Sequence, residues 1–551
     1  MKLKRTIVAP ALVAGVALVS GGWLLQQGVS DQRNVYEQAR VFDEVMTLLS
    51  QRFVERPSSA ELYRMATEGM IQELGDPHTT FLTPEEFKEF YTSMSGEYAG
   101  IGAQIVERDG WVTVLAPLPG TPAERAGLRA GDRIIEIEGQ STKGWNSDRA
   151  VKVLRGPKGQ PVQIKVVRIG VEEPIPFGIT REEIHLNSVP YAFMMADGVG
   201  YVSLSVFSES STREVREAVQ RLRSEGMKKL VFDLRENPGG LLDQGVGVAD
   251  FFLKPGQSVV ETRGRTAGDN TVARARNGEL VPGMPVVVLV DEYSASAAEI
   301  VAGALQDHDR ALVLGSRSFG KGSVQDLFPL SGGNFLKVTT SKWYTPVGRS
   351  IQKDLKQNGE ARPALAADAP VAEDGTPMIG SPADSTKPYR TASGRIVYGG
   401  GGIVPDMIVR PDTASTAEQE FFRAAAKGGS KFNDVLFRYA IEYGRKNPQL
   451  RPDFTVTPEM RRELFERLRA AGLDLTPEQY AGAQRFIDRR LGQEVVQHKF
   501  GANVAARRVT ASDRAVTEAH ALLRRAESPE ALLRLVPPAQ PESRMAPARA
   551  Q

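Results

Sequence analysis

The hydrophobic pattern changes its period near residue 290, and the change predicts a strand followed by a helix. Val286–Val290 is an unbroken run of aliphatic residues, which is typical of a strand covered on both faces in a parallel sheet. Over Ala297–Asp307 the apolar positions follow a helical period. A second short strand is predicted at Ala311–Leu314, and a turn with three glycines follows at Gly315–Gly322. The segment therefore reads as a β-α-β unit, and open α/β sheets bind ligands beyond the carboxyl ends of such strands.

Two side chains beyond these strand ends suit nucleophilic chemistry. Ser296 begins the predicted helix, where free N–H groups can hold a developing oxyanion. Lys321 lies in the glycine-rich turn. A lysine with its free pKa of about 10.4 is a poor base at neutral pH, but burial lowers that pKa. A dry site would let Lys321 take the proton of Ser296, as in Ser-Lys catalysis. Gln325, four residues after Lys321, falls on the same face, and its amide could hold the amine.

Each of these residues also has a simpler interpretation. A serine at a helix start can be only an N-cap, and a lysine between glycines is usually solvated. A nucleotide site is a second alternative, because Gly315–Lys321 matches the first seven positions of a phosphate-binding loop. The eighth position is Gly322, however, where such a loop has the Ser or Thr that reaches Mg²⁺. The ordered set on one β-α-β unit therefore favours the dyad over a nucleotide site.

The positions of the histidines and the lack of cysteine disfavour other kinds of catalytic site. His308 is the histidine nearest to Ser296 in the sequence, but a helix of this length separates the two by roughly 15 Å. No HExxH spacing is present, so a metalloprotease is not favoured. With no cysteine the chain has no disulfide, no thiolate metal site and no cysteine nucleophile. We predict no cofactor and no metal.

The segment from Asp291 to Gln325, DEYSASAAEIVAGALQDHDRALVLGSRSFGKGSVQ, resembles the carboxyl-terminal processing peptidases, or tail-specific proteases, of the S41 serine peptidase family. The resemblance runs from about Val35 to about Val409. It implies that Ser296, the second serine of SAS, is the nucleophile. It also implies that Lys321 of SFGKG is the base and that Gln325 of GSVQ positions the lysine.

Further motifs carry the same resemblance. VFDLRENPGG, Val231–Gly240, is a strand that ends in a double-glycine turn. The resemblance implies that the Gly240 N–H and the Ala297 N–H form the oxyanion hole. The segments Lys342–Gln352 and Ser393–Val409 are similar to family core segments. Because no motif residue is missing, we expect an active enzyme.

An upstream β-rich stretch resembles a PDZ domain. A short helix, a turn and a strand are predicted in TPAERAGLRAGDRIIEIEG, Thr121–Gly139, a second helix at Ala150–Leu154, and an edge-type strand at Val162–Val167. A PDZ groove takes a peptide as an added strand, and backbone N–H groups capture its terminal carboxylate. Arg168 would either sense the ligand or be an exposed strand arginine. The carboxylate is expected on the loop of Gly100, Ile101, Gly102 and Ala103.

The N-terminal pattern predicts export. MKLKR precedes Thr6–Leu25, a run without charge that is long enough to span a membrane, which needs about 20 residues. It is expected to be a signal peptide or an inner-membrane anchor, with the catalytic part in the periplasm or cell envelope. Charge is balanced, with 69 basic and 67 acidic residues, so nothing indicates nucleic acid. Two apolar stripes, Phe42–Phe53 and Leu62–Leu74, are interpreted as a packing or dimer element.

The predicted fold class is α/β multidomain. An S41 (crotonase-like or ClpP-like) peptidase core carries an inserted-type PDZ module, N-terminal helices and a helical C-terminal extension. Candidate helices of the extension are Phe421–Tyr443, Pro458–Ala471, Pro477–Lys499 and Ser512–Arg525. The predicted segments are 1–30 for the signal or anchor, 31–96 for the N-terminal helices, 97–182 for the PDZ domain, 183–412 for the core with a flexible insert at about 357–387, 413–536 for the helical extension, and 537–551 for a disordered tail.

These features together predict an extracytoplasmic serine endopeptidase. It would bind protein substrates by their C-terminal tails through the PDZ domain and cleave them through an acyl-enzyme on Ser296. An adaptor protein and a homodimer are partners that the sequence leaves open. The alternative is a PDZ scaffold with a silent peptidase core.

Overall fold

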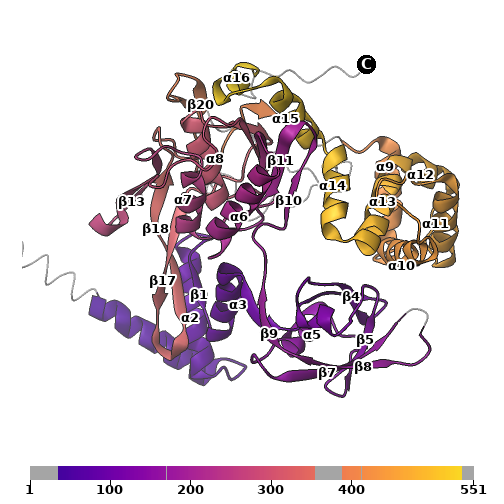
Figure 1. Ribbon diagram of the computed structural model, residues 1–551. Coiled ribbons are helices and arrows are strands. Elements are labelled where there is room, and N and C mark those ends of the chain that lie inside the picture. The colour runs from indigo at the N-terminus through magenta and orange to yellow at the C-terminus, as the bar shows by residue number, and fades with distance from the viewer. Residues whose placement is uncertain (1–34, 169–170, 354–386, 411–412, 537–551) are drawn as a thin grey trace, which may run out of the picture. The chain divides into compact units, whose positions relative to one another are not determined.

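The computed structural model describes residues 35–168, 171–353, 387–410 and 413–536 (Figure 1). The chain divides into two compact units. One holds the described residues up to Pro84 together with Gln325–Thr339, and the other holds Glu85–Val324 and the described residues from Thr340 onward. The apolar segment Thr6–Leu25, the expected insert apart from Lys387, and the tail lie outside the described residues. In the part of the chain that is described, no helix is long and apolar enough to cross a membrane.

A six-stranded sheet forms the centre of the larger unit. Its order is β10-β11-β12-β15-β16-β21, in which β10 is antiparallel to β11 and the other neighbours are parallel. The predicted strand Val286–Val290 is β15, and the predicted helix is α8, Ala297–Asp307. The remaining strands are β10 (Tyr191–Met194), β11 (Val199–Ser203), β12 (Lys229–Asp233), β16 (Leu312–Gly315) and β21 (Met407–Ile408).

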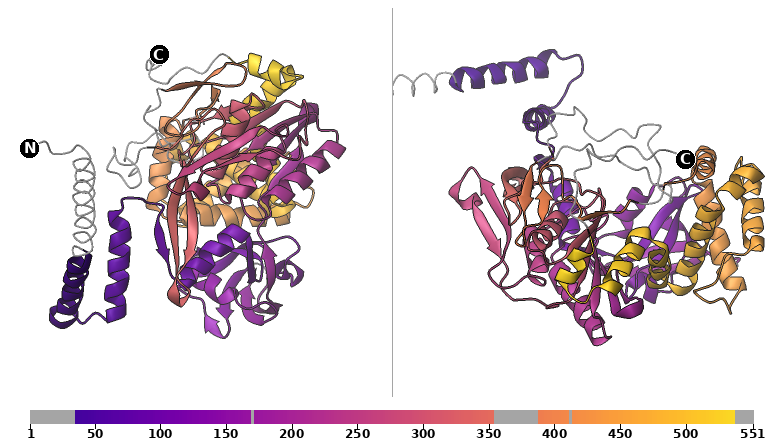
Figure 2. Two further views of the ribbon diagram at one scale, coloured as in Figure 1. Left: turned by 90° about the vertical axis from the view of Figure 1, so that its left-hand side faces the viewer. Right: turned by 90° about the horizontal axis from the view of Figure 1, so that it is seen from above.

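Helices cover both faces of this sheet (Figures 1 and 2). On one face Phe232, Val288 and Val313 pack into a core with α6 (Ser211–Ser224), α7 (Leu242–Asp250) and α8. On the other face Val287 and Leu312 pack against α15 (Arg514–Arg525) and α16 (Pro529–Arg534), which come from the C-terminal extension. Because neither face meets water, every residue of β15 is buried, which explains its uninterrupted apolar sequence.

The β-rich module of the same unit is a sheet in the order β3-β4-β5-β7-β8, with α5 packed against β3. The expectation of an edge-type strand at Val162–Val167 is wrong. This strand, β7, is interior, because β8 pairs along its second side. Its alternating burial reflects one buried face of the sheet. The elements are β3 (Ala103–Arg108), β4 (Trp111–Pro117), α4 (Pro122–Arg125), β5 (Arg133–Ile137), β6 (Gln140–Ser141), α5 (Ser147–Leu154), β7 (Pro161–Val167) and β8 (Ile175–Thr180).

The module is joined to the core by a two-stranded ribbon. The strand β2, Glu97–Gly100, enters the module, and β9, Glu182–His185, leaves it. The two pair antiparallel, with Glu97 opposite His185. The His185 ring lies 2.6 Å from the carboxylate of Glu214 on α6. The ribbon therefore ends at the helix that covers the central sheet.

The C-terminal extension is helical as predicted, but two of its expected helices are each divided. The predicted helix Phe421–Tyr443 is interrupted at Gly428, where α9 ends before α10 begins, and the predicted helix Pro477–Lys499 is interrupted at Ala483. Glycine favours helix ends, which explains the first break. The helices are α9 (Thr416–Lys427), α10 (Lys431–Lys446), α11 (Pro458–Ala470), α12 (Pro477–Gly482), α13 (Gln484–Phe500), α14 (Ala502–Ser512), α15 and α16.

The smaller unit combines helices with a β-hairpin. Residues 35–52 form a helix, α2 covers Ser59–Glu73, and β1, Thr80–Leu82, pairs antiparallel with the start of β18, Phe335–Tyr344. Most of the first expected apolar stripe, Phe42–Phe53, is exposed, whereas the second, Leu62–Leu74, has Leu62 buried and Met70 and Leu74 exposed. Phe42 and Phe53, for example, are 46% and 51% exposed. Packing inside the described chain therefore does not cover the first stripe.

Candidate active site

Three neighbouring strands bring the predicted residues to one edge of the central sheet. The turn Leu234–Gly240 follows β12, Asp291–Ser296 follows β15, and the glycine-rich turn with Lys321 follows β16. The strands β12, β15 and β16 are adjacent and parallel. Their carboxyl ends therefore meet at the same edge of the sheet, where α/β folds place reactive groups.

Ser296 and Ser294 lie in different surroundings. Ser294 is fully buried, and its hydroxyl donates to the Leu234 carbonyl over 2.8 Å. Ser296 is half-buried and has backbone angles φ 53° and ψ −113°. A residue with a side chain rarely adopts a positive φ, and such strain is concentrated at functional turns between a strand and a helix. These surroundings favour Ser296 as the serine that a substrate can reach.

Glu299, on the first turn of α8, binds the nucleophile segment and the lysine turn at once. One carboxylate oxygen accepts hydrogen bonds from the Ser296 N–H (2.8 Å) and the Lys321 N–H (2.9 Å). The other accepts from the Ser318 hydroxyl and the Gly320 N–H. The side chain is fully buried, and this burial raises the pKa of Glu299 to about 6, against the lowering effect of the hydrogen bonds. The carboxylate thus joins the backbone segments that carry the two predicted dyad members.

The double-glycine turn is tightly packed against the nucleophile segment. A Cβ on Gly239 would lie 2.6 Å from the Ser296 Cβ, and a Cβ on Gly240 would lie 2.1 Å from the Phe207 carbonyl oxygen. Phe207 donates its N–H to the Gly239 carbonyl and accepts from Leu241, as in a parallel bridge centred on Gly240. In that pattern the N–H of the central residue faces away from the partner strand. The Gly240 amide is thus not engaged by Phe207, as its predicted oxyanion role requires.

Asp291 connects the nucleophile segment to the double-glycine segment. Its carboxylate accepts from the Glu236 N–H over 3.0 Å and from the Ser294 N–H and hydroxyl. The Ala295 N–H donates to the Asn237 carbonyl over 2.9 Å, which adds a second connection. Burial raises the pKa of Asp291 to about 6. The two turns are therefore held together by charge-assisted and backbone hydrogen bonds.

The lysine turn is held from several sides. The Trp343 indole N–H donates to the Lys321 carbonyl over 3.0 Å, and the Gln352 side chain accepts from the Gly322 N–H over 2.9 Å. Gly320 has a positive φ of 94°, and a Cβ there would lie 3.0 Å from the Gly402 N and from the Lys353 Cβ. The two segments that resemble family core segments, Lys342–Gln352 and Ser393–Val409, thus pack around the turn that carries Lys321.

Gln325 belongs to the smaller unit. Its amide donates to the Thr339 hydroxyl over 3.2 Å, and the Thr339 N–H donates to the Thr79 hydroxyl.

His308, the nearest histidine to Ser296 in the sequence, caps the far end of α8 and contacts Gln257 and the Ser258 carbonyl. Among the described residues, no group of three or more acidic or histidine side chains has the arrangement of a metal site.

Sequence reasoning missed Glu299, although the sequence holds a signal for it. Ser296-Ala-Ala-Glu299 has the S-x-x-E spacing of a capping box at a helix start. That spacing predicts the bond from Glu299 to the Ser296 N–H. It does not predict the bonds to Gly320 and Lys321, which depend on how the next strand folds back.

A second buried network that sequence reasoning missed lies beside the double-glycine turn. Arg235 contacts Asp233 through two guanidinium nitrogens, and the Tyr201 hydroxyl donates to Asp233 over 2.8 Å. Another Arg235 nitrogen lies 2.8 Å from Asp513, the N-cap of α15. The C-terminal extension therefore supplies a charge that contacts the segment leading to Gly240.

The predicted carboxylate loop of the β-rich module is rigidly fixed. Gly102 has a positive φ of 75°, and a Cβ there would lie 2.4 Å from Thr121. The Gly102 carbonyl accepts from the Thr121 hydroxyl over 2.8 Å, and the Ile101 carbonyl accepts from the Ala123 N–H over 2.8 Å. Gly100 ends β2, and Ala103 begins β3, which lies at the edge of its sheet. An edge strand beside a fixed loop is the arrangement that peptide addition needs.

Arg168 is not the exposed strand arginine that we considered. Its side chain is largely buried, and two guanidinium nitrogens each lie 2.7 Å from the fully buried Asp132. One nitrogen also donates to the Gly127 carbonyl. The hydrogen bond to Asp132 is the main cause that raises the pKa of Arg168. This arginine stabilises the turn between α4 and β5.

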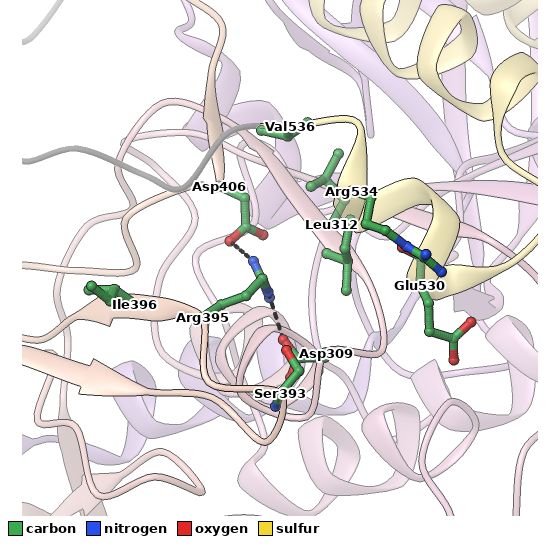
Figure 3. A pocket seen from close by; sticks show the side chains of 10 residues that line it. Asp309, Leu312, Ser393, Arg395, Ile396, Asp406, Glu530, Arg534 and Val536 are labelled. Carbon is green, nitrogen blue, oxygen red and sulfur yellow. Dashed lines mark hydrogen bonds and ion pairs between the residues drawn. The ribbon is translucent and has the colours of Figure 1, made fainter.

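A cavity of about 400 Å³ lies at the opposite end of the central sheet (Figure 3). Arg395 crosses it, with nitrogens 2.7 Å from Asp309 and 2.6 Å from Asp406. The cavity lies beside the first residue of β16, whereas Ser296 follows the last residue of β15. It is therefore remote from the predicted dyad. Its walls are formed by Asp309, Leu312, Ser393, Arg395, Ile396, Asp406, Glu530, Leu533, Arg534 and Val536.

Comparison with known proteins identifies two parts of the chain. Residues 198–359 match peptidase family S41, and residues 113–168 match a PDZ domain. The chain is 39% identical over 313 residues to a carboxy-terminal-processing protease of Bartonella bacilliformis, an alignment that covers 56% of this chain and 71% of the relative. It is 38% identical over 311 residues to a probable CtpA-like serine protease of Staphylococcus aureus, covering 56% of this chain and 62% of that protein. A solved photosystem II D1 C-terminal processing protease is 31% identical, with a TM-score of 0.34, over 56% of this chain and 83% of that one.

The fold, the strand-end site and these matches define a serine-type peptidase with a PDZ domain. The chain belongs to the carboxy-terminal-processing proteases of peptidase family S41.

Proposed function

We propose that the chain is an extracytoplasmic serine endopeptidase that cleaves proteins bound by their C-terminal tails, with Ser296 and Lys321 as its catalytic dyad. The observation that carries the proposal is the buried carboxylate of Glu299, which accepts hydrogen bonds from the backbone N–H groups of both residues. A carboxylate shared in this way holds the backbone of the nucleophile next to the backbone of the base, which supports the proximity that the reaction requires.

In the proposed acylation step, neutral Lys321 takes the proton of the Ser296 hydroxyl as the oxygen attacks the scissile carbonyl. The negative charge that develops on the carbonyl oxygen is held by the N–H groups of Gly240 and Ala297. Ala297 is the first residue of α8, where helix N–H groups lack an intrahelical acceptor. The protonated lysine then gives its proton to the leaving amine, and the acyl group remains on Ser296.

Deacylation uses the same groups. Lys321 takes a proton from water as the water oxygen attacks the ester carbonyl. The Ser296 oxygen leaves and receives the proton back from Lys321. Gln325 has the supporting role that the family resemblance gives it, which is to position the lysine amine.

The PDZ module presents the substrate. The tail would add as a strand to the edge of β3, with its carboxylate on the N–H groups of the Gly100–Ala103 loop. This proposal is supported by the edge position of β3 and by the internal hydrogen bonds that fix the loop. Bound tails would raise the local concentration of substrate at Ser296.

The location and assembly form part of the same proposal. The basic residues before Thr6–Leu25 favour export, with that segment as signal or inner-membrane anchor. The exposed apolar residues Phe42, Val45, Leu49 and Phe53 of the first stripe favour a homodimer, because exposed apolar patches mark interaction surfaces. An adaptor protein is the other occupant that the stripe could take.

Single alanine substitutions of Ser296 and Lys321 test the dyad. Each should abolish cleavage of a tailed protein substrate to a similar extent, because members of a catalytic unit act together. Ser224→Ala, which removes an exposed hydroxyl from the end of α6, is the control and should cleave normally. Labelling of the full chain with a serine-reactive probe should disappear in Ser296→Ala. Undiminished cleavage by either dyad variant would contradict the proposal, whereas wild-type labelling without any cleavage of tailed proteins would contradict the tail specificity alone.

A further inference from the structure

The peptidase core exposes few large hydrophobic side chains, and two of them neighbour the dyad residues in the sequence. In the described part of 183–412, outside 325–339, the exposed ones are Leu186, Val272, Tyr293, Phe319 and Ile396. Tyr293 precedes Ser296 by three residues, and Phe319 precedes Lys321 by two. Phe319 is 47% exposed and Tyr293 is 40% exposed. Single exposed apolar residues are ordinary, but this pairing beside a reactive centre is not a random scatter.

The two aromatic residues stand on backbone that is fixed to the dyad. The Phe319 N–H donates to the Ser294 carbonyl over 3.0 Å, which joins the segment of one ring to the segment of the other. The residues on both sides of Phe319, Ser318 and Gly320, donate to Glu299, which also accepts from the Ser296 N–H. The backbone that carries the two rings therefore cannot move far from the Ser296 segment without breaking buried hydrogen bonds.

The position of the rings defines what they can contact. A polypeptide whose carbonyl is attacked by Ser296 must pass over the loops that carry the dyad. Its side chains next to the scissile bond then lie against whatever those loops expose. Covering a half-exposed aromatic ring with an apolar side chain removes apolar surface from water and is favourable, whereas covering it with a charged side chain removes that charge from water and is unfavourable.

We propose that Phe319 and Tyr293 form an aromatic platform that selects polypeptide segments with apolar side chains beside the scissile bond. This inference rests on the proposed function and names the substrate class of the same site. Phe319 and Tyr293 are specificity-determining residues and take no part in proton transfer. The PDZ module would choose which protein is held, and the platform would choose where it is cut.

The test compares cleavage of two tailed substrate proteins by the full chain. Both carry the same C-terminal tail and one unstructured segment, with Leu and Val at the cleavage positions in one and Ser and Asp in the other. Phe319→Ala should lower kcat/KM for the apolar substrate about tenfold and change that for the polar substrate less than twofold. Tyr293→Ala should act in the same direction with a smaller change. Phe319→Leu, which keeps an apolar side chain, should restore most of the preference.

Two further measurements separate specificity from folding and from catalysis. Val272→Ala removes an exposed hydrophobic side chain from β14 (Thr271–Arg274) of the same core, and it should leave both substrates unaffected. The rate of labelling by a serine-reactive probe should be the same in Phe319→Ala as in wild type. An unchanged ratio of apolar to polar cleavage in Phe319→Ala, or an equal loss on both substrates, would overturn the platform while leaving the dyad intact. Failure of the wild type to cut either substrate would overturn the proposed function and the platform with it.

Discussion

The two ends of the central sheet each contain a buried carboxylate, and the two are stabilised in opposite ways. At the carboxyl ends of the strands, Glu299 is bonded by three backbone N–H groups and the Ser318 hydroxyl, all of them neutral. At the other end, Asp406 lies 2.6 Å from the guanidinium of Arg395 and also accepts from Gln306 and the Val313 N–H. Burial raises the pKa of both carboxyl groups, to about 6 for Glu299.

The difference separates a functional carboxylate from a structural one. A cation next to Glu299 would bring a second charge close to Lys321 and disfavour the protonated lysine that forms in the proposed reaction. Neutral donors hold the carboxylate in place without that charge. Asp406 has no such constraint. Its pair with Arg395 joins the residue before β20 (Ile396–Tyr398) to the segment after that strand, and the hydrogen bond from the Val313 N–H attaches the same segment to β16. The first carboxylate therefore should control activity, and the second should control stability.

Among the substitutions that test this comparison, Glu299→Ala should give the largest loss of activity. It leaves the Ser296, Gly320 and Lys321 amides without their acceptor, and we expect kcat to fall by roughly two to three orders of magnitude. Cleavage of a tailed substrate by folded protein, checked by circular dichroism, measures this. Glu299→Gln keeps one acceptor oxygen and should lose less. A variant that cleaves at more than a third of the wild-type rate would contradict the positioning role.

Asp406→Ala should destabilise the protein without a comparable loss of activity. It leaves the partly buried Arg395 with Asp309 as its remaining carboxylate, so the loss should lie below the about 3–5 kcal/mol that an unpaired, fully buried charge costs. Denaturant unfolding should show this loss, and kcat of the remaining folded protein should stay within about threefold. Leu312→Val, which changes the same cavity wall without removing a charge, is the matched control. A large fall in kcat with little change in stability would reverse our assignment of the two ends.

The pH dependence of stability and activity should give the smallest effect. It separates the contribution of Glu299 to the free energy of unfolding from its contribution to activity. Because its pKa is about 6 in the fold and 4.5 unfolded, the folded state binds its proton more tightly. The free energy of unfolding should therefore fall by about 2 kcal/mol as pH rises through 4.5 to 6, and Glu299→Gln should lack this change. Activity should rise over the same window, since only the ionised carboxylate can accept from all four donors.

Asp291 titrates in the same range and provides the control for that measurement. Its pKa is also raised to about 6, so Asp291→Asn should remove a separate part of the stability profile. Parallel stability profiles for wild type and Glu299→Gln between pH 4 and 7 would contradict the role of Glu299 in this titration.

The sequence predicted local elements better than it predicted how they pair. The strand Val286–Val290 and the helix Ala297–Asp307 agree with the structure, because an unbroken apolar run and a helical period are local signals. The interior position of β7 was missed, since it depends on pairing with β8, whose Pro176 and Gly178 weaken its strand pattern. Gly428 is a signal for a helix end, but the apolar period on both sides of it led to the prediction of one continuous helix.

The candidate site shows the same division. The motifs indicated Ser296 and Lys321, and the strand order places their turns on adjacent strands. For Glu299 the sequence holds a signal only for its capping bond to the Ser296 N–H. Its bonds to Gly320 and Lys321 join residues more than 20 positions apart, and only the folded chain brings these together. The contribution of Asp513 to the Arg235 cluster was beyond sequence reasoning, because the two lie 278 residues apart.

The two-stranded ribbon of β2 and β9 has a consequence for how such a protein can change. The chain enters and leaves the PDZ module at positions that face each other, Glu97 and His185, so the module is covalently joined to the peptidase at a single place. The module also contacts α10, where Arg108 lies 3.6 Å from Asp434. Recombination or engineering can therefore replace everything between these two points while leaving the strand order of the peptidase untouched, as domain insertions require. If the PDZ module selects substrates as proposed, exchange of this one module would change which proteins are bound without any change to the proposed catalytic residues.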